Sequence, residues 1–210
     1  MRLHAGRMNW VENWGKAAVG NYFSDAGSFL IDTVIGLYML AVMLRFLLQW
    51  VRADFYNPLS QFLVTVTNPP LVLLRRFIPG LFGVDFASIL LLIVLAVVKI
   101  YLIYAISGLT PQFPGVLLLA IGEVIQLGVY VFIFAMLIRV ILSWIQPGAY
   151  NPVLVLINQL TEPLMAPARR FIPPFGGLDI SPMLVFIFLY LTLMLVVRPI
   201  LDFGHMLALQ

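Results

Sequence analysis

The sequence of 210 residues contains no cysteine and only two histidines, His4 and His205. The absence of cysteine excludes disulfide frameworks, thiolate metal sites and cysteine nucleophiles, and the two histidines leave little for a metal or haem. We therefore expect no cofactor and no bound metal. Charged residues are also scarce, at 10% against roughly 25% in soluble domains, whereas apolar residues make up 62%. This balance excludes an ordinary soluble domain and indicates a membrane protein.

The apolar residues gather into four stretches, each long enough to cross the roughly 30 Å hydrocarbon core as a helix. Residues 108–115 separate the second stretch from the third, and their Gly and Pro residues predict a tight turn that makes these two spans a hairpin. The sequence therefore predicts an all-α membrane protein with four transmembrane helices, over residues 28–50, 86–107, 116–144 and 183–203.

A duplication organises most of the chain. When each residue is compared with the residue 94 positions later, residues 45–85 match residues 139–179 at 15 of 41 positions without a gap. Each unit consists of a span, an amphipathic connector and a second span. Because each unit crosses the membrane an even number of times, both units have the same orientation and form parallel tandem repeats. The matched residues include Arg45, Trp50, Tyr56, Asn57, Pro58, residues 75–79, Gly83 and Asp85, which meet Arg139, Trp144, Tyr150, Asn151, Pro152, residues 169–173, Gly177 and Asp179.

The repeats predict the division of the chain. We place the first repeat at residues 28–109 and the second at 110–210. Residues 1–27 then form an N-terminal extension. Its Trp10 and Trp14 lie four residues apart, a spacing that suits a tether at the outer membrane interface.

Each connector contains a predicted amphipathic helix. Asn57 is expected to cap a helix that begins at Pro58, with apolar residues at i, i+3, i+4 and i+7. Pro69 and Pro70, or Pro163 in the second copy, are expected to end this helix after about ten residues, which is too short to span, so we place it in the interface. The alternatives are a lid over the helix ends and re-entry into the bilayer. The stripes are Leu59, Phe62, Leu63 and Val66, and Val153, Leu156, Ile157 and Leu160.

The Lys and Arg residues indicate the orientation. Seven lie on or beside the connectors, whereas four lie on the opposite side of the membrane. By the positive-inside rule, the connectors are cytoplasmic and both termini lie outside. We expect Arg75, Arg76, Arg169 and Arg170 to meet anionic lipid headgroups or a partner protein.

The combined motifs resemble the YggT family of small bacterial membrane proteins, also called YlmG. The resemblance covers about residues 28–203 and rests on the Arg, Trp, Tyr-Asn-Pro, Arg-Arg-Phe-Ile-Pro and Gly-x-Asp motifs of each repeat. It implies location in the bacterial inner membrane and a supporting role. The family has no assigned chemistry, although its members are linked to osmotic-stress tolerance, bacterial division-gene clusters and plastid nucleoid or cytochrome assembly.

Ionisable residues also occur within the predicted spans, where an unpaired charge costs at least ~2.5–3.5 kcal/mol. Arg45 and Arg139 lie five residues from Trp50 and Trp144, so we expect their long side chains to snorkel to the cytoplasmic headgroups.

Four further charges are predicted to form pairs. Lys99 and Glu123 each lie eight residues from the hairpin turn, so they share a depth on adjacent helices and are expected to pair. Asp32 and Arg198, each about five residues inside the outer end of its span, form a second candidate pair.

Two functional hypotheses follow. In the first, the protein is a non-enzymatic structural or assembly factor, in which the charge pairs lock the helices and the basic connectors dock on anionic lipid or on a membrane or cytoplasmic protein. In the second, Lys99, Glu123 and Asp32 line the path of a channel or transporter, which would need a homo-oligomer. An enzyme is disfavoured because the spans carry no HExxH or GxSxG motif. We expect no direct contact with nucleic acid.

Overall fold

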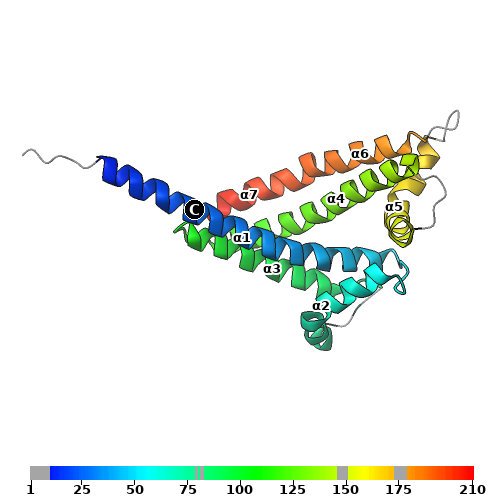
Figure 1. Ribbon diagram of the computed structural model, residues 1–210, viewed down its shortest axis with the longest axis horizontal. Helices are drawn as coiled ribbons and strands as arrows, with labels where there is room; N and C mark the ends of the chain where they lie inside the picture. Colours follow the sequence, from blue (N-terminus) through cyan, green and yellow to red (C-terminus); the bar gives the residue numbers. More distant parts are fainter. Residues whose placement is uncertain (1–9, 79, 81–82, 146–150, 173–178) are drawn as a thin grey trace, which may run out of the picture.

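The computed structural model describes residues 10–78, 80, 83–145, 151–172 and 179–210, without the side chains of residues 10–21, 144 and 145. Its elements are helices joined by short segments (Figure 1). They are α1 (Trp10–Trp50), α2 (Pro58–Phe77), α3 (Phe86–Ile106), α4 (Phe113–Ile145), α5 (Pro152–Phe171), α6 (Ser181–Thr192), the π-helix η1 (Leu193–Val197) and α7 (Arg198–Ala208).

The predicted spans are confirmed. Four helical segments are long and apolar enough to cross a membrane, and they cover Tyr22–Trp50, Phe86–Ile106, Phe113–Ser143 and Ser181–Ala208. The first three belong to α1, α3 and α4, and the fourth combines α6, η1 and α7. The turn between α3 and α4 includes Gly108 at a φ of +71°, a backbone conformation that glycine adopts without steric cost. The chain is thus an all-α protein with four membrane-spanning helices.

The helices form two groups that spread apart toward one end. Figure 1 shows α1 beside α3 and α4 beside α6 and α7, with the two groups closest near the turn that joins α3 to α4. We call that end the hairpin end. The connector helices α2 and α5 lie at the opposite end, which we call the connector end (Figure 1). Both connectors therefore lie at the same end, as two parallel repeats require.

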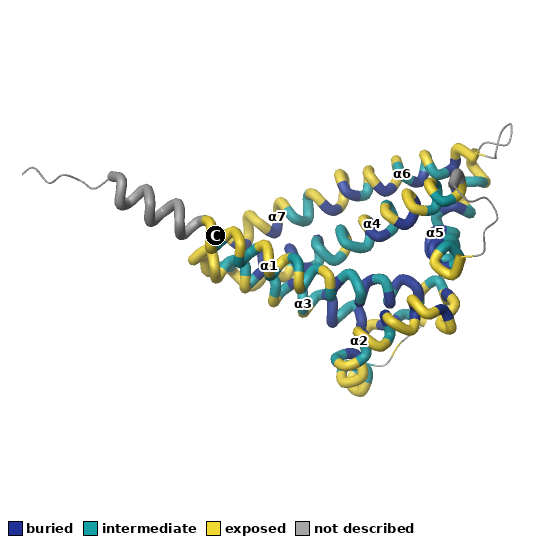
Figure 2. The backbone as a smooth tube through the Cα atoms, in the orientation of Figure 1, coloured by how far each residue is buried: buried dark blue, intermediate teal, exposed yellow. Residues whose placement is uncertain are grey.

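The spans pack through apolar side chains and through glycines. One buried cluster joins α1, α3 and α4 with residues of α5, and a second joins α4, α5 and the fourth span. Many large apolar residues are exposed, as expected where lipid covers a protein. Figure 2 shows exposed residues along all the spans. Gly115 permits the closest approach, because a Cβ atom there would overlap the backbone of Ala208. Small residues commonly allow such contact between membrane helices.

The fourth span contains a local irregularity. The backbone N–H of Arg198 donates to the carbonyl of Leu193, five residues earlier, within the π-helix Leu193–Val197. Pro199 follows at once and has no N–H to donate, so the regular hydrogen-bond ladder is already interrupted at this point. The sequence analysis predicted one span over residues 183–203 and did not predict the π-helix within it.

The N-terminal extension continues directly into the first span. Helix α1 is 41 residues long and begins at Trp10, so no break separates the extension from the residues after 27. The side chains of Trp10 and Trp14 lie outside the described part of the chain, and their role as an interfacial tether stays a prediction.

Candidate functional site

The connector helices are twice as long as predicted. Each runs for 20 residues, and Pro69, Pro70, Pro163 and Pro167 lie inside them. The expectation that Pro69 and Pro70, or Pro163 in the second copy, end the helices is wrong. A proline removes one backbone donor and bends a helix, but packing on both sides can keep the helix continuous. Figure 1 shows the change of direction within α2.

The first turn of each connector helix is capped as the sequence indicates. The Asn57 side-chain oxygen accepts a hydrogen bond of 3.0 Å from the backbone N–H of Leu59. In the second repeat, Asn151 accepts one of 2.9 Å from Val153. Proline occupies the first helical position in both. The Asn-Pro pair of the motif therefore starts the connector helix.

The arginine in the first span of each repeat hydrogen-bonds to the connector helix of that repeat. Arg45 is 5% exposed, and its guanidinium donates 2.8 Å to the Thr67 hydroxyl and 3.3 Å to the side-chain oxygen of Asn68. Arg139 donates 2.6 Å to Thr161 and 3.0 Å to Glu162. We call each arrangement an arginine clamp.

The arginine clamps correct one prediction. We expected Arg45 and Arg139 to snorkel to lipid headgroups, but their guanidinium groups contact α2 and α5 instead. The physical reason is that the connector helices lie across the ends of the spans. They offer hydroxyl, amide and carboxylate acceptors within 3.3 Å of the guanidinium nitrogens.

The two threonines are functional residues that the sequence reasoning missed. Thr67 and Thr161 are both 0% exposed, and each hydroxyl donates to the carbonyl four residues earlier, Leu63 at 2.6 Å and Ile157 at 2.7 Å. Each oxygen remains free to accept from arginine. Their signal was present, because Thr67 and Thr161 are identical across the 94-residue offset.

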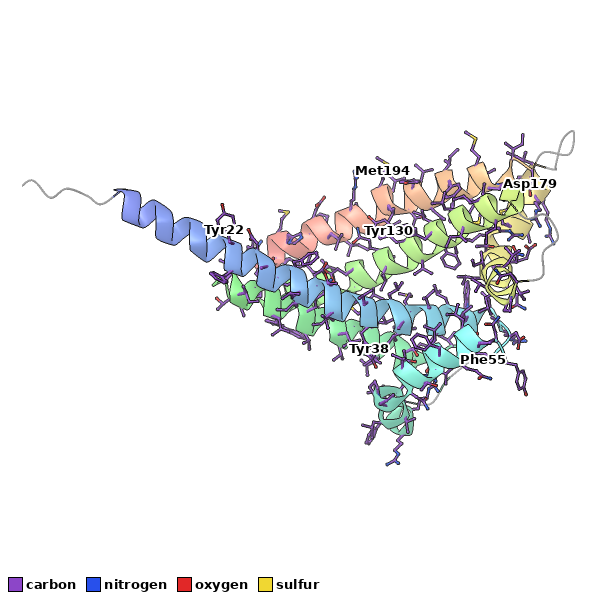
Figure 3. All side chains as sticks on the ribbon, viewed as in Figure 1. Tyr22, Tyr38, Phe55, Tyr130, Asp179 and Met194 are labelled. Carbon is purple, nitrogen blue, oxygen red and sulfur yellow. The ribbon has the colours of Figure 1, made fainter. Side chains whose placement is uncertain are left out.

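An ion pair joins the end of each connector helix to the aspartate that precedes the next span. Arg75 lies 2.5 Å from Asp85, and Arg169 lies 3.2 Å from Asp179. Figure 3 places Asp179 at the connector end. These contacts explain the Gly-x-Asp motif, because its aspartate precedes the first turn of the following span.

Asp85 and Asp179 are stabilised as carboxylates. Burial alone would raise the pKa of Asp85, but hydrogen bonds from Arg75 and Ser88 outweigh burial and lower the pKa below its ordinary value. For Asp179, burial is likewise outweighed by hydrogen bonds from Ser181 and Arg169, and the pKa is lowered. Both ion pairs are therefore charged at neutral pH.

The four connector cations separate into two roles. Arg75 and Arg169 are engaged by Asp85 and Asp179, and Arg169 also lies 3.2 Å from Glu162. The next residues, Arg76 and Arg170, are exposed and form no ion pair with any residue that the structure describes. In each repeat, one cation fastens the connector helix and its neighbour is left on the surface.

The apolar stripes of the two connectors differ in what covers them. Leu156 and Leu160 of α5 are each 3% exposed and belong to the cluster shared with α1. Their repeat equivalents in α2, Phe62 and Val66, are 61% and 38% exposed. Leu63 of the α2 stripe is buried in the same cluster, and Val153 of the α5 stripe is exposed, so each stripe is covered only in part. More of the α5 stripe packs on the bundle, which favours the lid alternative for α5, and interfacial placement of α2 stays a prediction.

The two connectors also contact one another. The Asn57 side chain donates 2.7 Å to the backbone oxygen of Pro152, and Gln159 accepts 3.2 Å from the backbone N–H of Asp54. The N-terminal cap of α2 is therefore fixed to the start of α5, and the repeats form one connected surface at the connector end.

The aromatic motif residues at this end are exposed where they are described. Trp50 is 51% exposed and Tyr56 is 89% exposed. The side chain of Trp144 and all of Tyr150 lie outside the described residues. Exposed Trp and Tyr side chains at the end of a span suit the membrane interface.

Three charges from three helices meet nearer the hairpin end. Lys99 of α3 lies 2.8 Å from Asp32 of α1 and 3.0 Å from Glu123 of α4. The ammonium has three N–H groups, so it can hydrogen-bond Asp32 while it also pairs with the buried Oε2 of Glu123. We call these three residues the charge cluster. It links α1 and α3 of the first repeat to α4 of the second.

The charge cluster agrees with one predicted pair and replaces the other. Lys99 does approach Glu123, but Asp32 shares that same cation, and the expected pair of Asp32 with Arg198 is wrong. Arg198 is exposed and makes no ion pair within the described residues. Equal depth did not suffice, because α1 packs closely on α3, which presents Lys99 to Asp32.

These features define an α-helical multi-pass membrane protein built from a duplicated unit, each unit with its own arginine clamp. The CCB3/YggT family model matches the chain twice, at residues 24–106 and 118–200. The chain therefore belongs to the CCB3/YggT family, and the sequence-based resemblance is confirmed.

Similar proteins occur in several bacteria. The chain is 48% identical to uncharacterized protein PA0392 of Pseudomonas aeruginosa over 180 residues, which cover 83% of this chain and 90% of that protein. It is 37% identical to uncharacterized protein YggT of Escherichia coli over 182 residues, covering 86% and 94%. A shorter match joins it to uncharacterized protein ycf19 of Porphyra purpurea, 34% identical over 77 residues, covering 36% and 80%. No solved structure matches the chain.

Proposed function

We propose that this protein is a non-enzymatic structural or assembly factor of the bacterial inner membrane, which presents two basic connector helices to anionic lipid or to a partner protein. The observation that carries the proposal is the division of labour among the arginines. In the first repeat, Arg45 and Arg75 fasten the connector helix and Arg76 stays exposed. In the second repeat, Arg139 and Arg169 fasten it and Arg170 stays exposed.

The energetics favour a positioning role for the arginine clamps. Burying a guanidinium is costly unless its donors are satisfied, and a satisfied buried arginine fixes the geometry of whatever it contacts. Arg45 has three acceptors on α2, at Val64, Thr67 and Asn68. A side chain held in this way supports a fixed helix at the membrane surface and is unavailable to a moving ion.

The orientation follows from the distribution of cations. Seven Lys and Arg residues lie on or beside the connectors against four on the other side, which supports a cytoplasmic location for the connectors and an outside location for both termini. In that orientation Arg76 and Arg170 face the anionic cytoplasmic leaflet. A role in envelope homeostasis, with links to osmotic-stress tolerance or cell division, is what the family resemblance adds to this proposal.

A channel or transporter component is the second candidate. Its supporting observation is the charge cluster, in which one ammonium within the spans serves the carboxylates of two other helices. Ionisable residues inside membranes often mark ion pathways. A homo-oligomer would be needed, because one bundle of four spans leaves a narrow path.

Two measurements on purified protein separate the candidates. The first is ion flux through proteoliposomes, where the structural proposal expects no selective conductance above empty vesicles. The second is cosedimentation of detergent-solubilised protein with anionic and neutral vesicles, in wild type and in the double variant Arg76→Gln, Arg170→Gln. The proposal expects a preference for anionic vesicles that the double variant loses, since each cation near a charged surface contributes ~1 kcal/mol. A selective conductance that Lys99→Met abolishes would instead favour transport.

A further inference from the structure

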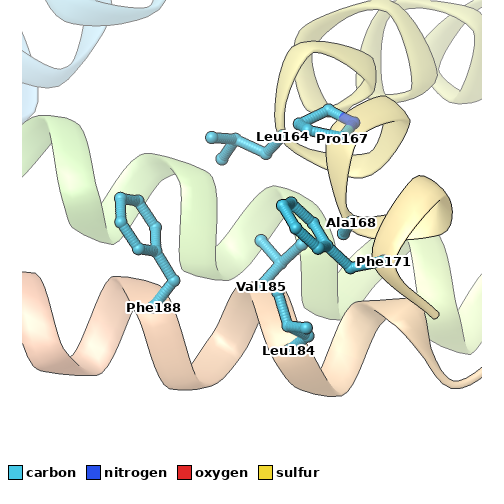
Figure 4. Close-up of a pocket in the computed structure, with 7 residues that line it drawn as sticks. All are labelled: Leu164, Pro167, Ala168, Phe171, Leu184, Val185 and Phe188. Atoms are coloured by element: carbon cyan, nitrogen blue, oxygen red, sulfur yellow. The ribbon is translucent and has the colours of Figure 1, made fainter.

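An apolar cavity lies between the second connector helix and the fourth span. It has a volume of about 280 Å³ and seven lining residues, all apolar. Figure 4 shows these side chains converging from α5 and α6. The lining residues are Leu164, Pro167, Ala168 and Phe171 of α5 and Leu184, Val185 and Phe188 of α6.

The cavity is associated with a difference between the repeats. Ala168 corresponds to Leu74 across the 94-residue offset. Leu74 packs against the main buried cluster, whereas Ala168 stands at the wall of the cavity with a much smaller side chain. The position that borders the cavity in the second repeat is therefore occupied by a leucine in the first repeat. The first repeat supplies a matched internal control.

The cavity lies at the connector end of the fourth span. Leu184 and Val185 belong to the first turn and a half of α6, which begins the fourth span. Phe171 is the last residue of α5 and follows Arg170 directly. An apolar recess thus begins beside the cationic end of a connector helix and extends along the first turns of a span.

Arg170 is the exposed cation that directly precedes the lining residue Phe171 in the sequence. Its neighbour Arg169 is already engaged by Glu162 and Asp179, whereas Arg170 is exposed without an ion pair among the described residues. A polar solute would lose its hydration against seven apolar side chains and gain no hydrogen bond from them. A hydrocarbon chain loses nothing there, and an anionic group attached to it would meet Arg170.

We propose that this cavity binds one acyl chain of an anionic phospholipid whose headgroup lies against Arg170. The inference rests on the proposed function and deepens it, because it replaces a general attraction to anionic lipid with a defined site on the second repeat. The corresponding surface of the first repeat, with Leu74 and Arg76, then attracts anionic lipid by charge alone.

The test uses full-length protein in liposomes that contain a phosphatidylglycerol probe with a photoactivatable acyl chain. Cross-linked peptides are identified by mass spectrometry, and a phosphatidylcholine probe with the same chain reports labelling without the anionic charge. We expect the phosphatidylglycerol probe to label segments of α5 and α6 about fivefold more than the phosphatidylcholine probe, the ratio expected from one cation.

Two variants test the two parts of the site. Ala168→Leu introduces the residue of the first repeat, and labelling at α5 and α6 should fall about tenfold, as expected if roughly two methylene groups lose their contacts. Arg170→Gln should remove the preference for phosphatidylglycerol. Arg170 is exposed, so this variant tests the site without disturbing the fold. Arg76→Gln is the matched control and should leave labelling of α5 and α6 unchanged.

The outcomes separate this inference from the function on which it rests. If Ala168→Leu melts like wild type and labelling of α5 and α6 is unchanged, or if Arg76→Gln and Arg170→Gln lower that labelling equally, the defined site is refuted. Binding to anionic vesicles that still depends on both arginines would leave the proposed function standing. If the double arginine variant binds anionic vesicles as well as wild type does, the proposed function fails.

Discussion

Arg45 in the first span donates a hydrogen bond of 2.8 Å to Thr67 on the connector helix, and the same bond recurs at 2.6 Å between Arg139 and Thr161. Both threonines have no exposed surface. The duplicated sequence thus preserves a specific side-chain contact in addition to a pattern of apolar residues. That contact determines where each connector helix lies.

Removing the threonine hydroxyl should weaken the arginine clamp. Thr67→Val keeps the shape of the side chain but leaves the buried guanidinium of Arg45 without its shortest hydrogen bond, which should cost about 1–3 kcal/mol. Thr67→Ser restores the hydroxyl and should be closer to wild type. The measurement is thermal unfolding of the detergent-solubilised protein. Equal melting temperatures for wild type and Thr67→Val would contradict the clamp.

The charge cluster predicts an order of stability among variants. Glu123→Gln leaves Lys99 paired with Asp32 and should be mild, whereas Lys99→Met leaves two carboxylates without a cation and should be the most damaging. The double variant leaves only Asp32, whose side chain is 61% exposed, and should be more stable than Lys99→Met alone. The largest loss is bounded by the roughly 3–5 kcal/mol of soluble buried pairs, and membrane reference states reduce such values.

Thermal aggregation of wild type, both single variants and the double variant, analysed as a double-mutant cycle, measures this order. Additive losses would show that Lys99 and Glu123 do not interact. A stable, folded double variant that abolishes a measured ion flux would assign the charges to transport.

Asp85 predicts a response to acid. Its pKa is lowered in the folded protein because the hydrogen bonds from Arg75 and Ser88 outweigh burial. A group with a lowered pKa contributes stability that is present above its unfolded pKa, about 4, and is lost as the pH falls through the folded value. The melting temperature of wild type should therefore fall below about pH 4 more steeply than that of Asp85→Asn. The variant should begin lower at pH 7, and parallel curves would exclude Asp85 as the cause.

The two apolar stripes should respond differently to truncation. Leu156 is 3% exposed and its repeat equivalent Phe62 is 61% exposed. Leu156→Ala should cost about 2–5 kcal/mol, as is usual for a buried leucine. Phe62→Ala should leave the melting temperature in detergent near wild type, because little of that side chain is packed. Equal losses would mean that α2 is covered as α5 is.

The orientation is open to cysteine labelling, since the chain has no native cysteine. Gln61 on α2 and Gln112 before α4 are both exposed and lie at opposite ends of the bundle. With the connectors cytoplasmic, an impermeant thiol reagent added to intact spheroplasts should modify Gln112→Cys and spare Gln61→Cys. Labelling of both variants from outside would overturn the topology.

The sequence by itself determined the elements and their order. Four long apolar stretches, the 94-residue offset and the caps at Asn57 and Asn151 all follow from local patterns, because span length, helix start signals and repeats depend on neighbouring residues. The prolines inside the connectors misled that reading. The sequence pattern alone does not show whether contacts with neighbouring helices keep a proline-containing helix continuous.

Only the tertiary structure decided the partners. Arg45 contacts Thr67, where we had expected lipid headgroups, and Asp32 contacts Lys99, where we had expected Arg198. The rotation of each helix about its axis decides which partner is near. The same cause separates Leu156 from Phe62, which occupy one position of the repeat and differ in burial. Neighbouring helices set these differences, and a repeat in sequence does not require the two copies to have the same neighbours.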